Sequence, residues 1–230
     1  MTFHRVDIYE VAALVGPAMS GRRRFGVPPG GPVDVETWEQ ASEVDGVAWE
    51  LFGIAVSHWE VEKAGSAVVV GGERKLLLNA VEISQGSPFY LEPGDVLRIE
   101  PVRPGQVAYL GSCVTLENLV ASEVADTLRI WPSIDGIDQV DLFDRDFSIS
   151  IQSSRVGFRL NERIEGQPDL PNSEPTTPGV IQVTPGGELI IMGPDGPTIG
   201  GYRRIGAVVE EDLPKLGRIG FERPLRFAPR

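Results

Sequence analysis

The sequence has very few residues of the kinds that bind metals or form redox centres. Its 230 residues include two histidines, His4 and His58, and a single cysteine, Cys113. One cysteine excludes an internal disulfide and fits a reducing compartment. So few imidazole and thiolate groups also exclude a metal site rich in histidine or cysteine. We therefore predict no metal centre.

Basic residues are scarce as well. The chain has 21 lysines and arginines against 33 aspartates and glutamates, which gives a formal net charge of −12. Nucleic acids and anionic membranes are bound by dense basic surfaces. The one basic cluster, Arg22 to Arg24, is too short to form such a surface. The composition therefore argues against a nucleic-acid or membrane partner.

Long apolar runs are also missing. No run approaches the length that spans a bilayer, and residues 1–7 lack the apolar stretch of a signal peptide. We therefore expect a soluble, cytoplasmic protein. The chain is 41% hydrophobic. That content can form one β-rich domain over residues 1–230, or two β lobes, 1–120 and 121–230.

The familiar catalytic motifs do not occur. There is no G-x-S-x-G nucleophile elbow, no P-loop and no H-E-x-x-H helix. His58 falls on the polar side of a predicted strand, which is typical of a solvated histidine. Cys113 has no histidine at an identifiable activating position, so we interpret it as a buried small residue.

What the sequence does contain is a series of short strands. Residues 56–63 alternate, with Trp59 and Val61 on one side and His58 on the other, as in a half-buried strand. The apolar residues 67–70 precede Gly71-Gly72, and a second apolar run follows, so that a hairpin is predicted there.

Further short runs at 96–99, 106–110 and 188–192 are each bounded by Gly and Pro turns. Frequent short strands of this kind favour a mainly β fold, a barrel or a sandwich. Residues 161–172, which include two prolines and a glycine, are predicted to be a mobile loop.

One segment has helical periodicity instead. Asp34 is a plausible N-cap, and apolar residues recur at helical spacing over residues 34–43. A second, weaker helical pattern covers residues 206–216, where Asp212-Leu213-Pro214 favours a short turn as the alternative.

Glycine and proline gather in two regions, residues 22–34 and 173–202. Such backbone can approach a ligand closely, because glycine adds no Cβ and proline fixes φ in advance. The alternative is that these regions are elaborate turns. Glu174 and Asp195 differ from the other acids in lying inside Gly- and Pro-rich frames, where binding groups tend to occur.

These regions carry a family resemblance. Residues 26–34, GVPPGGPVD, resemble the G-V-P-x-[SG]-G-x-[MV]-D signature of the biotin-dependent carboxyltransferase and allophanate hydrolase subunit 2 family. That family includes KipA and the C subunit of 5-oxoprolinase. Residues 153–160 (SSRVGFRL), 173–175 (SEP), 178–183 (PGVIQV) and 198–202 (TIGGY) follow in the family's order. The resemblance extends from about residue 5 to the C-terminus.

The resemblance implies a cyclophilin-like β-barrel with one or two short helices. It also implies a homologous partner of the type of KipI or of the 5-oxoprolinase B subunit. In 5-oxoprolinase it further implies a third chain, the LamB/YcsF-type A subunit. No tightly bound cofactor is implied for this chain. ATP or biotin would act through the partner subunits.

The resemblance and the residues together suggest a small-molecule site. Backbone N–H groups at Gly30-Gly31 and Gly200-Gly201 are predicted to form an anion-binding nest, with charge added by nearby arginines. The two framed carboxylates would position an amide or ureido N–H. The predicted catalytic residues are Glu174 and Asp195, and the predicted substrate-binding residues are Arg23, Arg24, Gly30, Gly31, Ser173, Gln182, Thr198, Gly200, Gly201 and Tyr202. In the alternative, Arg155 and Arg159 brace carboxylates inside the barrel and the glycines only turn corners.

The chain departs from the family pattern at several places, two of which remove polar groups. Residues 15–21 (VGPAMSG) lack the Gln and Asp of the family's V-Q-D-x-G-R, and Pro197 stands where the family has a glutamine. Proline lacks both the amide side chain and the backbone N–H. Two functions therefore stay open: a subunit of a 5-oxoprolinase or carboxyltransferase assembly that acts on a small amide or ureido substrate, and a non-catalytic regulatory or binding module that pairs with a KipI-like protein.

Overall fold

The structure is a computed structural model that describes residues 3–5, 11–112, 126–133, 140–165 and 172–230. The chain divides into two compact units. The first comprises residues 1–17 and 34–123, and the second comprises residues 18–33 and 124–230. Segment 18–33 therefore packs with the C-terminal unit, although the first unit surrounds it in sequence. Cys113 lies outside the described residues, as do residues 166–171 of the predicted loop.

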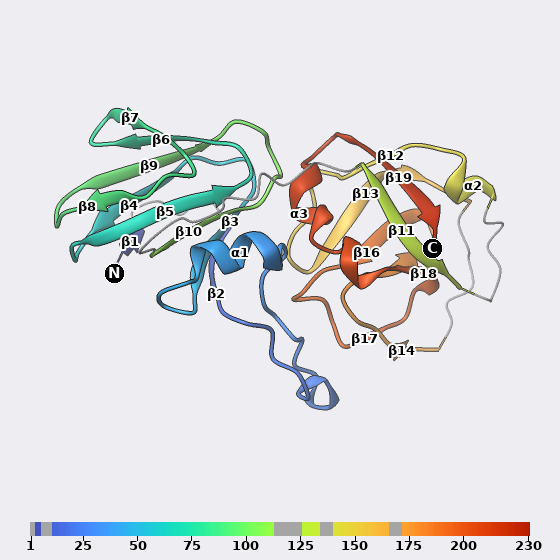
Figure 1. Cartoon of the computed structure of the whole chain (residues 1–230). Helices are drawn as coiled ribbons and strands as arrows, with labels where there is room; N and C mark the ends of the chain where they lie inside the picture. Colours follow the sequence, from blue (N-terminus) through green and yellow to red (C-terminus); the bar gives the residue numbers. More distant parts are fainter. Residues whose placement is uncertain (1–2, 6–10, 113–125, 134–139, 166–171) are drawn as a thin grey trace. The chain divides into compact units, whose positions relative to one another are not determined.

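The first unit consists of two antiparallel sheets of five strands each (Figure 1). One sheet has the order β1 (Phe3–Arg5), β4 (Ser57–Val61), β9 (Val96–Pro101), β6 (Arg74–Leu78) and β7 (Val81–Ile83). The other has the order β2 (Val11–Val15), β3 (Ala48–Phe52), β10 (Ala108–Ser112), β5 (Gly65–Gly71) and β8 (Phe89–Leu91). A core cluster that includes Trp59, Leu97 and Leu110 draws residues from both sheets.

The strand predictions in this unit are confirmed, but the predicted hairpin is wrong. In β4, Ser57, Trp59 and Val61 are buried and Glu60 is exposed, as alternation requires. β5 and β6 follow each other in sequence, yet they lie in different sheets. A Cβ on Gly72 would come within 2.6 Å of the Gln106 side chain. Gly71 and Gly72 thus let the chain pass closely along residues 106–107 on its way to the other sheet.

The predicted helix is present as α1 (Val35–Ala41). Asp34 caps it, because its carboxylate accepts hydrogen bonds from the Thr37 N–H at 3.2 Å and from the Thr37 hydroxyl at 2.6 Å. The helix packs tightly on β10, where a Cβ on Gly111 would lie 1.9 Å from the Ala41 carbonyl oxygen.

A buried polar cluster fixes the start of this helix. The Tyr109 hydroxyl of β10 donates to Glu50 Oε2 of β3 at 2.7 Å and accepts the Asp34 N–H at 2.9 Å. Burial and the negative charge of Glu50 raise the pKa of Tyr109 well above its ordinary value. The phenol is therefore protonated in the folded protein at neutral pH.

The second unit is built on a seven-stranded sheet. Its order is β12 (Phe147–Ser148), β19 (Pro224–Pro229), β11 (Thr127–Pro132), β18 (Arg203–Val208), β15 (Val180–Val183), β16 (Glu188–Met192) and β13 (Gly157–Arg163). β11 and β19 run parallel. Ile149, next to β12, forms an antiparallel bridge with Leu160 of β13, and the Ser150 N–H donates to the Arg159 carbonyl at 2.8 Å. The two edge strands therefore meet, and the sheet closes into a barrel.

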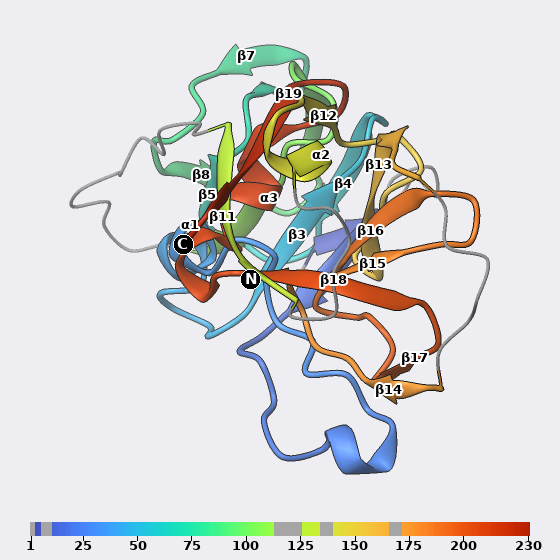
Figure 2. The ribbon, with the colours of Figure 1, turned by 90° about the vertical axis from the view of Figure 1, so that its right-hand side faces the viewer.

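Short helices and a small ribbon complete this unit. The helices are η1 (Arg23–Phe25), α2 (Val140–Phe143), η2 (Glu210–Asp212) and α3 (Lys215–Ile219). The ribbon pairs β14 (Glu174–Pro175) with β17 (Ile199–Gly200). In Figures 1 and 2 the ribbon and the loop that carries η1 both extend below the seven-stranded sheet.

The helix predicted at residues 206–216 is wrong over its first residues, because β18 continues to Val208. The alternative of a short turn near Asp212 is confirmed by η2. The Asp212 carboxylate accepts hydrogen bonds from the backbone and guanidinium of Arg129 at 2.7–3.0 Å, and Lys215 Nζ lies 2.8 Å from it. Burial alone would raise the pKa of Asp212, but the hydrogen bonds from Arg129 and Lys215 hold it well below its ordinary value.

Candidate functional site

Most of the predicted site residues form two groups in the second unit, and Arg23, Arg24 and Tyr202 lie outside both groups. The first group, which we call the glycine clamp, joins Gly31 to Asp195 through Arg155 and Gly30 to the neighbouring Pro194. The second, which we call the ribbon cluster, surrounds β14 and β17 and consists of Ser173, Glu174, Thr176, Gln182, Thr198, Gly200, Gly201 and Arg204.

The glycine clamp is held by one buried arginine. The Arg155 side chain is only 9% exposed. Its Nε and Nη2 donate to the two oxygens of Asp195 at 2.7 and 3.0 Å, and Nη2 also donates to the Gly31 carbonyl at 2.8 Å. This is a bidentate ion pair, which is both stronger and more directional than a single hydrogen bond. The clamp therefore fixes segment 18–33 to the loop that carries Asp195.

The packing of this segment accounts for the two glycines. The Gly30 N–H donates to the Pro194 carbonyl at 3.0 Å, so it is already engaged and does not point to an external anion. Gly31 has φ +84°, and a Cβ there would lie 2.8 Å from Ala18 Cβ. Only glycine fits at position 31 without displacing the neighbouring chain.

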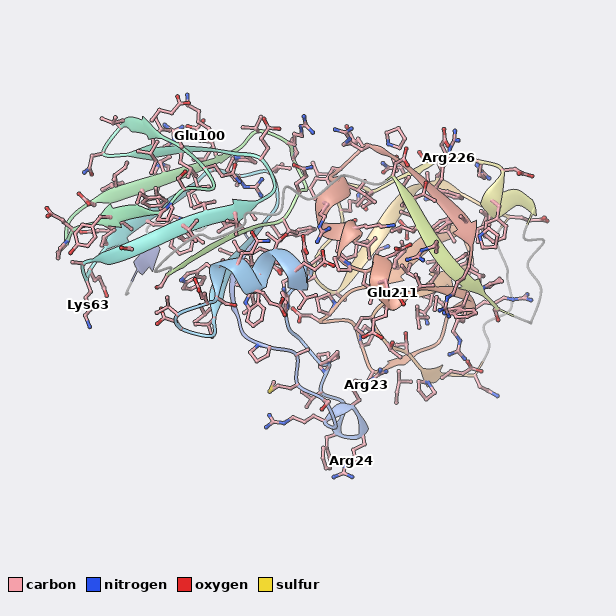
Figure 3. The ribbon with its side chains drawn as sticks, viewed as in Figure 1. Arg23, Arg24, Lys63, Glu100, Glu211 and Arg226 are labelled. Atoms are coloured by element: carbon pink, nitrogen blue, oxygen red, sulfur yellow. The ribbon has the colours of Figure 1, made fainter. Side chains whose placement is uncertain are left out.

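The alternative prediction for the arginines is confirmed. Arg155 braces Asp195, and Arg159 Nη1 donates to Glu188 Oε2 at 2.5 Å. Arg23 and Arg24 belong to η1, at the tip of the loop (Figure 3). The Arg24 guanidinium lies over the exposed Phe25 ring, 4.7 Å from its centroid.

The ribbon cluster is organised by strand pairing. Glu174 lies opposite Gly200, Pro175 lies opposite Ile199, and the Thr176 N–H donates to the Thr198 carbonyl at 3.0 Å. Residues opposite each other, and residues two apart on one strand, share a face. Glu174, Thr176, Thr198 and Gly200 therefore form one face of the ribbon, the inner face.

Exposure differs most between the residues nearest β15 and those of the outer face. Thr176 on the inner face is 1% exposed, whereas Ile199 on the outer face is 61% exposed. Gln182 of β15 lies against the inner face and is 5% exposed. A Cβ on Gly200 would come within 2.4 Å of Gln182 Nε2. The missing side chain at position 200 thus allows the amide to approach the ribbon backbone.

The remaining predicted residues lie around this contact. A Cβ on Gly201 would lie 3.6 Å from Ser173 Oγ, which is an ordinary contact distance. Tyr202 is partly exposed next to the ribbon in sequence. Glu174 forms an ion pair with Arg204 Nη2 of β18, and both side chains are about half exposed. The carboxylate of Glu174 is therefore balanced by a neighbouring positive charge.

Sequence reasoning missed two residues of the ribbon cluster. Arg204 has no motif signal; it lies opposite Gln182 in the pairing of β15 and β18, and its side chain forms an ion pair with Glu174 of the ribbon. Thr176 lies between two motif segments, and its hydroxyl is buried without a hydrogen-bond partner in the described structure. No pattern in the sequence distinguishes it from Thr177.

A polar cavity lies elsewhere in the unit. It is lined by Phe143, Asp144, Arg145, Asp146 and Arg226. The hydrogen bond from Arg226 lowers the pKa of Asp146. Among the described residues, no group of three or more His, Cys, Asp or Glu side chains is arranged to hold a metal ion. The described part of the chain also has no helix long and apolar enough to cross a membrane.

Known proteins resemble this chain in fold over nearly its whole length. The solved structure of TTHA0988 superposes with a TM-score of 0.79 at 21% identity, covering 95% of this chain and 54% of that chain. Urea amidolyase of K. lactis gives 0.80 at 19% identity, covering 99% of this chain and 18% of that chain. Urea carboxylase of Kluyveromyces lactis gives 0.76 at 20% identity, covering 95% and 26%.

The chain thus spans about half the length of TTHA0988 and a smaller part of the two yeast enzymes. At these identities the likeness establishes the fold, which is that of a carboxyltransferase domain. The predicted fold class, a mainly β barrel with short helices, is confirmed.

Sequence comparison supports the resemblance in part of the chain. Residues 117–229 match the family model described as "Carboxyltransferase domain, subdomain A and B". Over 83 residues the chain is 35% identical to the C subunit of 5-oxoprolinase from Escherichia coli (strain K12), a match that covers 35% of this chain and 27% of that protein. These matches support the resemblance that the motifs predict, to the biotin-dependent carboxyltransferase and allophanate hydrolase subunit 2 family.

Proposed function

We propose that this protein is the carboxyltransferase-domain subunit of a multi-subunit enzyme that acts on a small amide or ureido substrate. The assembly would be of the 5-oxoprolinase or the biotin-dependent carboxyltransferase type. The similarity to the C subunit of 5-oxoprolinase and the fold shared with urea carboxylase support this assignment. The substrate would bind at the ribbon cluster.

The observation that carries the proposal is the buried amide of Gln182 against Gly200. A carboxamide offers two N–H donors and one carbonyl acceptor, and the same groups occur, in complementary arrangement, in an amide or ureido substrate. Few polar groups placed on a rigid scaffold are what orient a small ligand. β15 lies inside the barrel sheet, so the amide is held on a rigid element.

The two predicted catalytic carboxylates would have different roles. Glu174 lies at the half-exposed edge of the ribbon and is paired with Arg204. In that position it would accept an N–H of the substrate. Asp195 is held by the buried Arg155, so its contribution would be to position segment 18–33 and the following Thr198.

ATP or biotin would reach the site through partner subunits. The partners would be a KipI-like homologue of the 5-oxoprolinase B subunit and, for the 5-oxoprolinase reaction, the LamB/YcsF-type A subunit, in the cytoplasm. The ureido group of biotin carries the same N–H and C=O groups as an amide substrate, so it fits the Gln182 amide equally well. When bound, carboxylated biotin supplies the carboxyl group.

The test is reconstitution with both candidate partner subunits, with release of glutamate from 5-oxoproline measured with and without ATP. Carboxylation of urea is measured in parallel with a biotin carboxylase partner. We expect one of the two activities. Activity of the isolated chain would contradict the proposal, and so would inactivity of every assembly.

A matched pair of variants locates the site. Gly200→Ala pushes the Gln182 amide aside, because the new Cβ would overlap Nε2. Gly201→Ala places its Cβ at an ordinary contact distance. Both glycines lie outside the positive-φ region, so alanine causes no backbone strain. We expect KM to rise about tenfold for Gly200→Ala, the effect of losing one or two good hydrogen bonds, and to change little for Gly201→Ala.

One observation favours a second function, that of a regulatory module paired with a KipI-like protein. Both framed carboxylates are engaged by arginines and the Gly30 N–H is engaged by Pro194. Groups engaged in this way brace a structure rather than catalyse. A stable complex with a KipI-like partner that turns over neither 5-oxoproline nor urea would support this function.

A further inference from the structure

The hydroxyl of Thr176 is an exception among the buried polar groups of the chain. Its Oγ1 is buried and has no hydrogen-bond partner among the described residues, and Thr176 is 1% exposed. Buried polar atoms in native proteins nearly always have a partner, because an unpaired one costs folding free energy. A hydroxyl kept in such a position therefore has an open place for a partner that the described residues do not supply.

The hydroxyl lies in the ribbon cluster. Thr176 is two residues from Glu174 and pairs with Thr198, so its side chain belongs to the inner face of the ribbon. The Gln182 amide lies against the same face beside Gly200. A hydroxyl and a carboxamide thus face one narrow region between the ribbon and β15.

The charges of the side chains in this region indicate which kind of ligand group would bind there. Of the four residues of the inner face only Glu174 has an acidic side chain, and it forms an ion pair with Arg204. A hydroxyl and an amide both donate and accept hydrogen bonds, and neither carries charge. They match a neutral group that also donates and accepts, and they offer no compensation for a buried carboxylate or ammonium.

Admitting such a group would require the ribbon to open. Its strands β14 and β17 are two residues each. An isolated pairing of two such short strands has little stability of its own. Separating the ribbon from β15 therefore breaks few interactions. The opening would uncover Thr176 and Gln182 together.

We propose that Thr176 is a ligand-contacting residue, and that its hydroxyl and the Gln182 amide bind one neutral donor-and-acceptor group of a small ligand beneath the ribbon. The inference rests on the proposed function in taking the ligand to be small and polar. It adds a contact that no motif indicates.

The experiment uses the full chain with two probes, 2-pyrrolidone, which donates and accepts, and cyclopentanone, which only accepts. The variants are Thr176→Val, which removes the hydroxyl at constant shape, and Thr176→Ser, which keeps it. Thr177→Val is the control, since its hydroxyl is exposed and bonds only the Pro178 carbonyl within the described structure. Binding is followed by NMR titration, and stability by calorimetry.

We expect 2-pyrrolidone to bind the wild type, Thr177→Val and Thr176→Ser alike, and to bind Thr176→Val about fivefold or more weakly. Cyclopentanone should bind weakly to all of them. Thr176→Val should melt at the wild-type temperature or above, because its hydroxyl has no partner to lose. A wild type that does not bind 2-pyrrolidone overturns the inference. Equal binding by Thr176→Val does so too, as does a fall in its melting temperature of more than about 5 °C that Thr176→Ser avoids.

The same variants separate this inference from the proposed function. If the reconstituted assembly turns over its substrate with an unchanged KM in Thr176→Val, the contact is wrong and the function stands. If 2-pyrrolidone binds through Thr176 but no assembly is active, the contact stands and the function is wrong.

Discussion

Replacing Asp195 by asparagine tests whether this residue is structural. Arg155 is nearly buried and donates two hydrogen bonds to the carboxylate, while its Nη2 also reaches Gly31. Removal of one partner from a buried pair typically costs about 3–5 kcal/mol, because a charge is left uncompensated. Asparagine keeps one acceptor oxygen, and the Asp195 side chain is 39% exposed, so water offsets part of the loss. We expect a loss of about 2–3 kcal/mol.

Calorimetry measures this loss directly. For a chain of this size, about 1 kcal/mol lowers the melting temperature by roughly 2–4 °C, so Asp195→Asn should melt roughly 4–12 °C below the wild type. The control is Asp146→Asn, which removes an Asp from an exposed pair with Arg226. Surface pairs contribute little, so the control should shift by less than about 2 °C.

A double-mutant cycle assigns the effect to the pair. In an Arg155→Met background, Asp195→Asn should cost much less than in the wild type, because no buried guanidinium remains to be compensated. If Asp195→Asn stays within about 0.5 kcal/mol of the wild type, the clamp contributes nothing measurable. Asp195 would then return to being a candidate for catalysis.

Three further predictions concern stability. Gly31→Ala should lower the melting temperature more than Gly21→Ala, since both have positive φ but only position 31 brings the new Cβ within 2.8 Å of a neighbour; calorimetry checks the difference. Because the pKa of Tyr109 is raised in the folded state, stability should fall as pH rises above about 10, the value for an unfolded tyrosine, and urea titrations of Tyr109→Phe should show a flatter alkaline limb. Because the pKa of Asp212 is lowered, stability should be full above about 4 and fall as pH drops further, a dependence that Asp212→Asn should lose.

Local features of the fold could be predicted from the sequence. Asp34 as an N-cap and the alternation in β4 depend on neighbouring residues alone, and the structure confirms both. Sheet membership could not be predicted in the same way. β5 and β6 are adjacent in sequence, but their partners β10 and β9 come later in the chain and decide which sheet each one joins.

In the candidate site, too, local features could be predicted from the sequence and long-range contacts could not. Motif order brought Gln182 and Gly200 to attention, and the structure places them in contact. The bond between Arg155 and Asp195 joins residues 40 positions apart, and the burial of Thr176 depends on a ribbon whose two strands are far apart in sequence. Composition and periodicity carry no information about such pairings, because both are local measures.

The carboxylates of Glu174 and Asp195 therefore differ in the free energy that it would cost each of them to leave its arginine and bind a substrate. Glu174 and Arg204 are both about half exposed, and exposed pairs of this kind contribute only about 0–1 kcal/mol, so a substrate N–H can replace the arginine at little cost. Asp195 can leave Arg155 only by leaving the buried guanidinium unpaired, which costs about 2–3 kcal/mol. A ligand as small as an amide gains too little from a few hydrogen bonds to meet that cost. Substrate recognition is accordingly expected at the ribbon, where Glu174, Gln182 and Thr176 lie, and the glycine clamp is expected to hold the loop that supports it.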